Sequence, residues 1–453
     1  MRSFRGFYVP AAVVAVSILM ARVAHPEDAP EAAESAQRAA SLEELDQRVR
    51  ILERRLELER EAAEAKTRES PVLTAGKDGI SLRSADGAFG VRFKGYLHAD
   101  GRFFFEDEER PNVDTFLIRR ARPIFEATAF RIFDLRIMPD FGEGRTVLQD
   151  AYLDARLLDE LKLRIGKFKE PFGIERLQSA TDMRFIERGL PNNLVPNRDV
   201  GGQLYGDLLG KRLNYAVGIF NGVPDGGSGD IDVTGDKDFA GRVFLLPFAG
   251  SEDFAFFEGL GIGIAGTVGN QEGALPTLRT TGQAAFFTYA AGARADGSRW
   301  RISPQAHFYR GRFGLLAEYV RSTQDVVLGA VTETLTNEAW QVQLNWVLTG
   351  EDAGYKSVDP RHPFDARAGN WGAVELVARV SSLRVDKDAF PVLADPRVSA
   401  SDALAVGGGV NWYLNRAVKL AVDYEWSEFD DGAADFQDRE DEHVLLLRAQ
   451  IAF

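Results

Sequence analysis

Three arginines stand close together in the stretch FLIRRAR (116–122), at positions Arg119, Arg120 and Arg122. A guanidinium group presents a planar fork of donors that matches two oxygens of an oxyanion such as phosphate. The stretch reads as a strand, and neighbouring side chains of a strand point to opposite faces. If the strand crosses a membrane, an arginine that faces lipid at the midplane costs roughly 2–4 kcal/mol. Either a bulge therefore turns both Arg119 and Arg120 inward, or one of them lies beyond the hydrocarbon band. The chemistry available here is recognition of an anion.

A second group of arginines lies in residues 170–199, where strand-like alternation stops after Lys169 and resumes near Val200. Irregular stretches of this length are uncommon in compact domains and usually have a function. We expect a loop that folds into the interior of the fold and narrows it, with a solvated external loop as the alternative. The candidates for the constriction are Arg184, Arg188 and Arg198, beside Arg176 and the acids Glu170, Glu175, Asp182 and Glu187.

Catalytic and metal-binding patterns are poor in this sequence. The chain has no cysteine, so it has no thiol nucleophile, and its five histidines lack metal-ligand spacing. The strand histidines considered for a hydrolase are His98 and His307, and neither has an evident serine partner. The acidic run 230–238 lacks the ligand that a calcium loop needs at position 12. We expect neither an enzyme nor a bound cofactor or metal.

The net charge of the chain restricts its partners. The formal charge is −14 over 453 residues, which argues against nucleic acid as a partner. Much of the acidity lies in two expected surface loops, 225–238 and 429–442. If the chain forms a channel, acids in its surface loops could repel anions at the channel mouth. They need not set the electrostatic field at the narrowest part of the channel.

The N-terminus resembles a secretory signal. Arg2 and Arg5 precede an apolar run from Ala11 to Ala21, which is too short to span a bilayer as a helix. We expect a signal peptide over residues 1–24, with a membrane anchor as the alternative. No later stretch has eighteen apolar residues, so any structure that crosses a membrane must be built from strands.

Three segments precede the strands. We expect 25–40 to be disordered and 67–89 to be a linker, because both are polar and contain proline. Between them, 41–66 has a heptad pattern that predicts a small parallel coiled coil, with a lone charged helix or a solvated linker as the alternative. The seam residues are Leu42, Leu45, Val49, Leu52 and Leu56, and Ser41 with Glu44 forms a capping box at the start.

From about residue 90 onward, period-2 alternation predicts strands. The sixteen expected strands are 91–105, 114–127, 130–140, 147–157, 160–169, 200–209, 212–221, 239–248, 257–268, 300–310, 312–323, 335–348, 374–385, 402–414, 417–427 and 442–453. A seventeenth apolar stretch, 284–293, lacks clear alternation and is assigned to a long loop. Bacterial outer-membrane barrels of a single chain carry an even number of strands, which favours sixteen.

The character of the two faces of each strand helps to distinguish a closed barrel from a soluble sandwich. In 335–348, Trp340 and Val342 alternate with Gln341, a pattern that both folds share. Sixteen strands would make a very large sandwich. A closed barrel has no open edges, and its outer side can expose the apolar rows to lipid. We therefore predict an all-β fold, a 16-stranded antiparallel transmembrane β-barrel (90–453) preceded by the coiled-coil helix, around an aqueous lumen.

If the apolar rows face lipid, the charged residues that line the lumen can be identified. The expected cations, beyond those of FLIRRAR, are Arg136, Arg156, Lys162, Arg164, Arg301, Arg379, Lys419 and Arg448. The expected acids are Asp134, Asp150, Asp154, Glu318, Glu375, Asp423 and Glu425. A lumen of alternating signs is often structural, since cross-strand ion pairs neutralise it.

The last strand alternates to the final residue, Phe453. An apolar strand that ends the chain in phenylalanine resembles the terminal signal by which the barrel assembly machinery recognises outer-membrane proteins. An ordinary C-terminal strand is the alternative.

Several stretches, in their order and spacing, resemble the phosphate-selective porin family (the porin O and P type) of Gram-negative outer membranes. They are GKFKEPFGIE (166–175), FIERGLPNNLVPNRDVG (185–201), YAVGIFNG (215–222), RISPQAHFYRGRFGLLAEYV (301–320) and FLIRRAR. The resemblance implies a trimeric, 16-stranded barrel that passes small anions. In that family, paired arginines on this strand feed a ladder that lines the constriction, which assigns that role to Arg119 and Arg120.

The resulting expectation is an outer-membrane porin for passive diffusion of small anions, phosphate or polyphosphate, selected by lumen arginines and lysines. Its partners would be outer-membrane lipid and two further copies of the chain, with the N-terminal segment in the periplasm. A general or differently selective porin on the same scaffold is the alternative. A barrel enzyme and a structural tether to the cell wall are the readings from other classes.

Overall fold

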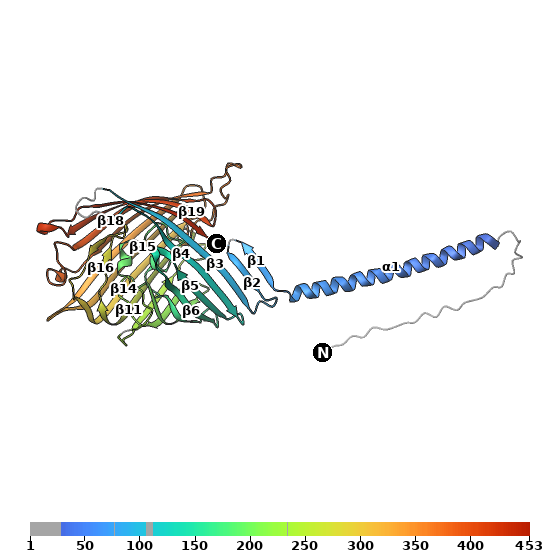
Figure 1. Ribbon diagram of the computed structural model, residues 1–453, viewed down its shortest axis with the longest axis horizontal. Coiled ribbons are helices and arrows are strands. Elements are labelled where there is room, and N and C mark those ends of the chain that lie inside the picture. Colours follow the sequence, from blue (N-terminus) through green and yellow to red (C-terminus); the bar gives the residue numbers. More distant parts are fainter. Residues whose placement is uncertain (1–28, 77, 106–111, 233) are drawn as a thin grey trace. The chain divides into compact units, whose positions relative to one another are not determined.

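The computed structural model describes residues 29–76, 78–105, 112–232 and 234–453 (Figure 1). The chain divides into two compact units between Ser70 and Pro71. The expected signal peptide, 1–24, lies outside the described residues. Of the described helices, none is long and apolar enough to cross a membrane.

The first unit contains one helix, α1 (Ala29–Glu69). The prediction of disorder over 25–40 is wrong from Ala29 onward, where α1 begins, because a run rich in alanine has high helix propensity. The capping box is wrong for the same reason: Ser41 lies within the helix, and its hydroxyl donates to the carbonyl of Arg38 at 2.9 Å. The seam leucines are exposed, 67% for Leu42, and the coiled coil stays a prediction.

The second unit is a closed antiparallel β-barrel of sixteen strands, as the alternation predicts. The barrel strands are β3 (Gly90–Phe105), β4 (Thr115–Ala129), β5 (Phe133–Asp140), β6 (Val147–Arg156), β7 (Lys162–Lys169), β8 (Arg198–Leu208), β9 (Leu213–Phe220), β10 (Asp238–Leu245), β11 (Leu260–Ala274), β14 (Arg294–Arg310), β15 (Phe313–Leu328), β16 (Val331–Val347), β17 (Ala373–Arg384), β18 (Ala400–Tyr413), β19 (Val418–Asp431) and β20 (Glu442–Ala452). The barrel closes where β20 pairs with β3, from His443 opposite Phe105 to Ala452 opposite Tyr96. Every strand expected from the sequence is present.

The connections contain short elements. They are α2 (Ile174–Leu177), the strands β12 (Leu278–Arg279) and β13 (Ala285–Phe287), and the 3-10 turns η1 (Gly142–Gly144), η2 (Leu190–Asn193), η3 (Ala255–Phe257), η4 (Lys387–Ala389) and η5 (Ala434–Phe436). The stretch 284–293, expected as a loop, belongs to the connection between β11 and β14. Its Phe286 and Phe287 are buried against the loop between β7 and β8 and against strands of the wall.

The linker expected at 67–89 is wrong. After α1 ends, β1 (Val72–Gly76) and β2 (Gly79–Arg83) form a hairpin, and β2 pairs with the start of β3, with Ile80 opposite Phe93. The start of β3 extends past its pairing with β20, so its free backbone groups can accept another strand. The sheet therefore begins before residue 90.

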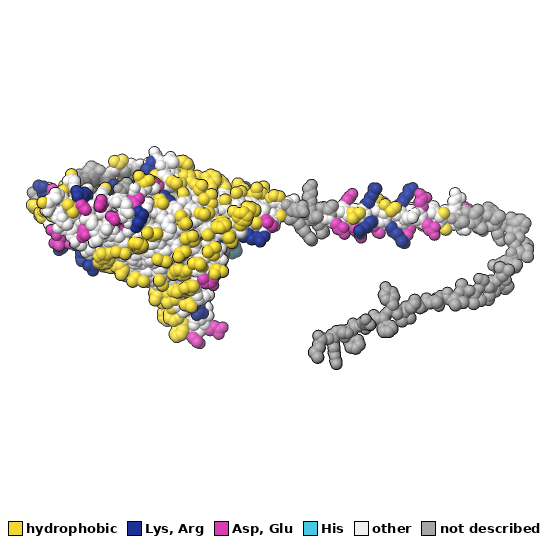
Figure 2. Space-filling model, turned by 90° about the horizontal axis from the view of Figure 1, so that it is seen from below, with side chains coloured by type: hydrophobic (Ala, Val, Ile, Leu, Met, Phe, Trp, Pro, Cys, Tyr) yellow, Lys and Arg dark blue, Asp and Glu magenta, His cyan; other side chains and the backbone are white. Residues whose placement is uncertain are grey.

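The outer wall of the barrel is apolar and the inner wall is polar. On β16, Leu344 is 50% exposed and Gln343 is 3% exposed, and the same alternation runs along the neighbouring strands. Figure 2 shows hydrophobic side chains spread over the outer wall on the face in view. Apolar rows that point outward match a surface in contact with lipid. The geometric expectation for the barrel is confirmed.

Candidate functional site in the lumen

The loop between β7 and β8, residues 170–197, folds into the barrel. Its Phe172, Leu190 and Leu194 are buried and pack against Phe286, Phe287 and other apolar residues within the barrel. Backbone amides of the loop also bind the opposite wall: Ile174 donates to Glu318 on β15 at 2.9 Å, and Ile186 donates to Asp423 on β19 at 2.5 Å. The expectation that this loop turns inward is thereby borne out in its geometry.

A second segment meets the loop from the other end of the barrel. Residues 348–372 join β16 to β17 at the end where the C-terminus lies. Arg184 of the loop donates to the carbonyls of Gly354 and Lys356, at 2.5 and 2.7 Å. Its Nε lies 2.9 Å from Glu375 on β17. Arg184, expected at the constriction, is therefore buried behind the loop and anchors it.

Between the loop and strands β4 to β10 lies a chamber of about 940 Å³. Its basic lining consists of Arg119, Arg120, Arg122, Arg136, Arg145, Arg164, Lys169, Arg176, Arg188, Arg198, Arg242 and Arg279. Its acidic lining consists of Asp140, Glu143, Asp150, Glu187 and Asp225. The chamber is thus locally positive although the whole chain carries −14. Fixed charge at the narrow part of a pore, and not net charge, sets the local field.

Arg119 and Arg120 both turn inward because β4 has a bulge at this point. The register with β3 pairs His98 with Arg120 and Ala99 with Ile118, which leaves Arg119 as the extra residue. The expected bulge is therefore present. Both guanidinium groups reach the same carboxylate, that of Glu187 on the loop: Nε of Arg119 lies 2.6 Å from Oε1, and Nη2 of Arg120 lies 3.6 Å from Oε2.

Glu187 is ionised in this environment. It is only 3% exposed, and burial alone would raise the pKa of its carboxyl. Arg119, Arg120 and Arg448 outweigh burial and hold that pKa well below its usual range. The arginine pair that the resemblance assigns to anion binding is therefore already engaged by an anion of the protein itself.

Most other lumen cations that the sequence predicts form cross-strand ion pairs. Their contacts are Arg122 with Asp140 at 2.6 Å, Arg136 with Asp150 at 3.2 Å, Lys162 with Asp207 at 3.0 Å, Arg164 with Asp154 at 2.8 Å and Arg198 with Asp150 at 2.7 Å. Pairs of this kind neutralise the wall and fix its side chains. The expectation of a lumen with alternating, largely neutralised charge therefore agrees with the structure here.

Arg301 and Arg379, also expected in the lumen, do not line the chamber. Arg301 lies 2.6 Å from Asp225 and donates to the carbonyl of Val223. Arg379 contacts Glu425, and its guanidinium lies 4.1 Å from the centre of the Phe185 ring. Both are about 1% exposed, so they hold loops to the wall.

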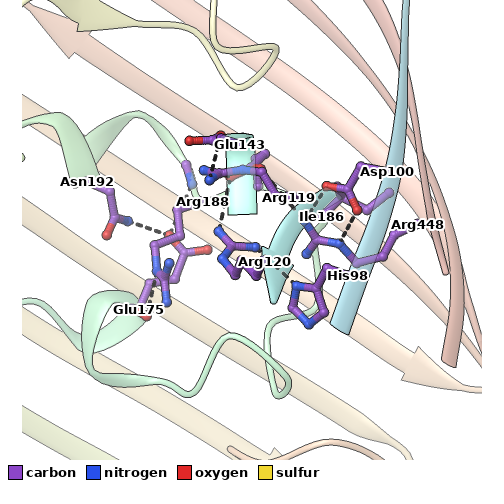
Figure 3. A network of polar contacts seen from close by, with 12 residues as sticks. His98, Asp100, Arg119, Arg120, Glu143, Glu175, Ile186, Arg188, Asn192 and Arg448 are labelled. Atoms are coloured by element: carbon purple, nitrogen blue, oxygen red, sulfur yellow. Dashed lines mark hydrogen bonds and ion pairs between the residues drawn. The ribbon is translucent and has the colours of Figure 1, made fainter. Parts of the chain in front are cut away.

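Three cations at the loop have no carboxylate within 4 Å among the described residues: Lys169, Arg176 and Arg188. Lys169 and Arg188 donate to the same carbonyl, that of Gln178, at 2.6 and 3.2 Å. Arg176 donates to the carbonyl of Asn192 at 2.8 Å. All three line the chamber, and their charge is not neutralised by a neighbouring acid. Figure 3 shows Arg188 beside Glu175, whose backbone carbonyl accepts from Nε of Arg188 at 3.3 Å.

Lys169 was missed as a site residue by the sequence reasoning, and Arg176 was named in the loop but was not among the constriction candidates, although both lie in GKFKEPFGIER. Alternation identifies the faces of strands, so it gives no signal for which charges at the end of a strand or in a loop line the lumen. The described residues hold no group of three or more His, Cys, Asp or Glu that could bind a metal ion.

The sequence pattern of the family described as phosphate-selective porin O and P matches residues 91–222 and 261–453. The chain belongs to this family. Within it, Porin O of Pseudomonas aeruginosa is 25% identical to this porin over 389 residues, which cover 78% of this chain and 86% of that protein.

Solved outer-membrane proteins share the fold of this porin. The channel DcaP of Acinetobacter baumannii superposes with a TM-score of 0.54 and 12% identity, over 82% of this chain and 99% of that one. An anion-selective porin from Comamonas acidovorans superposes with a TM-score of 0.52 and 10% identity, over 81% and 100%. Together with the family, these barrels identify an outer-membrane channel.

Proposed function

We propose that this porin selects small anions for passive diffusion, and that the loop cations Lys169, Arg176 and Arg188 set the selection. The observation that carries the proposal is their lack of carboxylate partners in a chamber whose other cations are mostly paired. A permeating ion in a narrow pore responds to the unneutralised fixed charge nearest to it. Three such positive charges attract anions and repel cations.

Small oxyanions are the solutes that fit these donors best. Arginine forks bind two oxygens of a phosphate at once, and a polyphosphate offers several such groups. The family to which the chain belongs is described as phosphate-selective, and this description supports an anion as the solute class. Phosphate and polyphosphate are therefore the first solutes to test.

A general or differently selective porin on the same scaffold is the second candidate. The observation that favours it is the contact of Glu187 with Arg119 and Arg120, which removes the pair from solute binding. In that case the remaining loop cations would give only weak preference among anions.

We also propose a homotrimer in the outer membrane, with the N-terminal segment in the periplasm. A barrel of similar fold, OmpT of Vibrio cholerae, has a structure in trimer form that superposes with a TM-score of 0.50, 12% identity, and 81% and 100% coverage. The heptad seam of α1 gives three chains a shared place to associate. Phe453 would act as the recognition signal for the barrel assembly machinery.

The reversal potential of the purified full-length channel in a planar bilayer tests the proposal. With a gradient of KCl across the membrane, an anion-selective channel gives a reversal potential toward the equilibrium potential of chloride. A reversal potential toward that of potassium would refute anion selection. Inhibition of the chloride current by added phosphate then separates an oxyanion channel from a general one.

A further inference from the structure

Four guanidinium groups converge on one carboxylate, that of Glu187. Arg119 binds it with two hydrogen bonds, at 2.6 and 3.2 Å. Arg102, Arg120 and Arg448 approach it to 3.6, 3.6 and 3.7 Å. The four arginines come from β3, β4 and β20, three neighbouring strands of the wall, whereas Glu187 comes from the inserted loop. We name these four residues the arginine cluster.

The arginine cluster carries more charge than its other acids balance. Arg448 is paired with Asp100, at 2.8 and 2.6 Å, and Arg119 also contacts Glu143, at 2.9 Å. Figure 3 shows Arg448 beside Asp100, and Arg120 beside His98. Without Glu187, four cations would face two carboxylates of the described residues, Asp100 and Glu143, and burying uncompensated charge is costly.

The arginine cluster also has hydrogen-bond donors to spare. Nε and Nη2 of Arg102 are buried and make no hydrogen bond among the described residues. In the same part of the chain, the side chain of Arg120 makes one hydrogen bond, with Nδ1 of His98 at 3.3 Å. A carboxylate offers two oxygens to these groups, whereas a phosphate offers more oxygens and would engage donors that Glu187 leaves free.

We propose that Glu187 is a specificity-determining residue: its carboxylate occupies the oxyanion position of the arginine cluster and excludes the solute from it. A tethered carboxylate acts at an effective concentration in the millimolar range or above, so a dilute free anion does not displace it. The loop cations Lys169, Arg176 and Arg188 then select the permeating anion. This inference rests on the proposed function. Removal of the Glu187 charge opens the arginine cluster to phosphate.

The matched variants are Glu187→Gln, which keeps the shape and loses the charge, and Glu187→Asp, which keeps the charge. Glu170→Gln is the control for a Glu-to-Gln change at a buried position of the same loop, since Glu170 has no arginine or lysine within 4 Å among the described residues. Chloride current through the full-length channel is measured in planar bilayers while inorganic phosphate is added.

The expected result is that Glu187→Gln is half-inhibited by phosphate at a concentration about tenfold lower than the wild type, equivalent to ~1.4 kcal/mol of tighter binding. Glu187→Asp and Glu170→Gln should match the wild type. Equal half-inhibiting concentrations for Glu187→Gln and the wild type would overturn the proposal.

If Glu187→Gln does not fold, the double variant Arg119→Gln with Glu187→Gln removes a nearly neutral pair and leaves Arg102, Arg120 and Arg448 against Asp100. It should still be inhibited at lower phosphate than the wild type, and equal inhibition would contradict the proposal. The reversal potential of the wild type is recorded on the same channels. A cation-selective wild type would refute the proposed function, while the comparison between variants decides the role of Glu187 separately.

Discussion

Nε of Arg119 lies 2.6 Å from the carboxylate of Glu187, and this contact joins the bulge of β4 to the loop that enters the lumen. The bulge aims two consecutive arginines inward, and the loop brings an acid to meet them. The wall of the barrel and the inserted loop are thereby coupled by charge as well as by packing. Any change of charge at this contact should alter both the position of the loop and the field in the chamber.

The anchor of the loop is the pair Arg184 and Glu375. Arg184→Ala leaves the buried Glu375 without its cation, which costs about 3–5 kcal/mol when a buried pair loses one partner. We expect a loosened loop, seen as larger fluctuations of the open-channel current. We also expect the barrel to unfold at a lower temperature, measured by the change of its mobility in gel electrophoresis after heating. Arg184→Gln combined with Glu375→Gln removes both charges and should be milder. Wild-type stability and quiet current in Arg184→Ala would contradict this role.

Glu170, at the start of the loop, makes the stability of the channel depend on pH. Burial raises the pKa of its carboxyl to about 8, against the opposing effect of Arg301. Because the folded state holds the proton more tightly, its stabilising effect is complete below the ordinary value of 4.5 and is lost as the pH rises through about 8. The unfolding temperature of the wild type should therefore fall as the pH rises from 5 to 9, and that of Glu170→Gln should fall by less. The same slope in both proteins would contradict the assignment.

The positions of the strands and of the inserted loop could be predicted from the sequence. Alternation such as that of Trp340 and Gln341 is a local property of a strand, and it fixes which face meets lipid. The break after Lys169 is equally local. The bulge at Arg119 followed from the cost of placing an arginine in lipid, which is a constraint on one strand.

The partners of the charges could not be predicted in the same way. Arg119 and Glu187 are 68 residues apart, and only the inward path of the loop brings them together. The hairpin of β1 and β2 was missed because it depends on the free edge of β3, a tertiary feature. The early start of α1 at Ala29 could not be predicted in this way, because proline and acidic residues are typical of disorder while the alanines around them favour a helix.

Phe453 closes the barrel beside Gly95. Its amide donates to the carbonyl of Gly95 at 3.0 Å, and the amide of Gly95 donates back at 2.9 Å. Deletion of Phe453 removes this pair together with the terminal aromatic ring. We expect a several-fold lower yield of folded barrel in the outer membrane and unchanged conductance of the molecules that assemble. Phe453→Tyr is the control and should assemble normally. A normal yield of the deletion variant would contradict the role of Phe453 in assembly.

The seam of α1 can be tested with a single cysteine, because the natural chain has none. In a parallel coiled coil, Val49 of each copy faces Val49 of the next, and Arg48 of one copy lies opposite Glu53 of another. Val49→Cys should therefore form an intermolecular disulfide in the full-length protein under oxidising conditions. Gln47→Cys, on the outer side of the helix, should not. Crosslinking of both variants to the same extent would indicate that the helices do not associate through this seam.

The reversal potential of a loop-cation variant tests the central claim most directly. Arg176→Gln combined with Arg188→Gln removes two unpaired charges, and we expect the anion-to-cation permeability ratio to fall at least threefold, equivalent to ~0.7 kcal/mol. Lys162→Gln combined with Asp207→Asn removes a neutral pair from the same lumen and should leave the ratio as in the wild type. An unchanged ratio in the first variant would show that Arg176 and Arg188 do not select the ion.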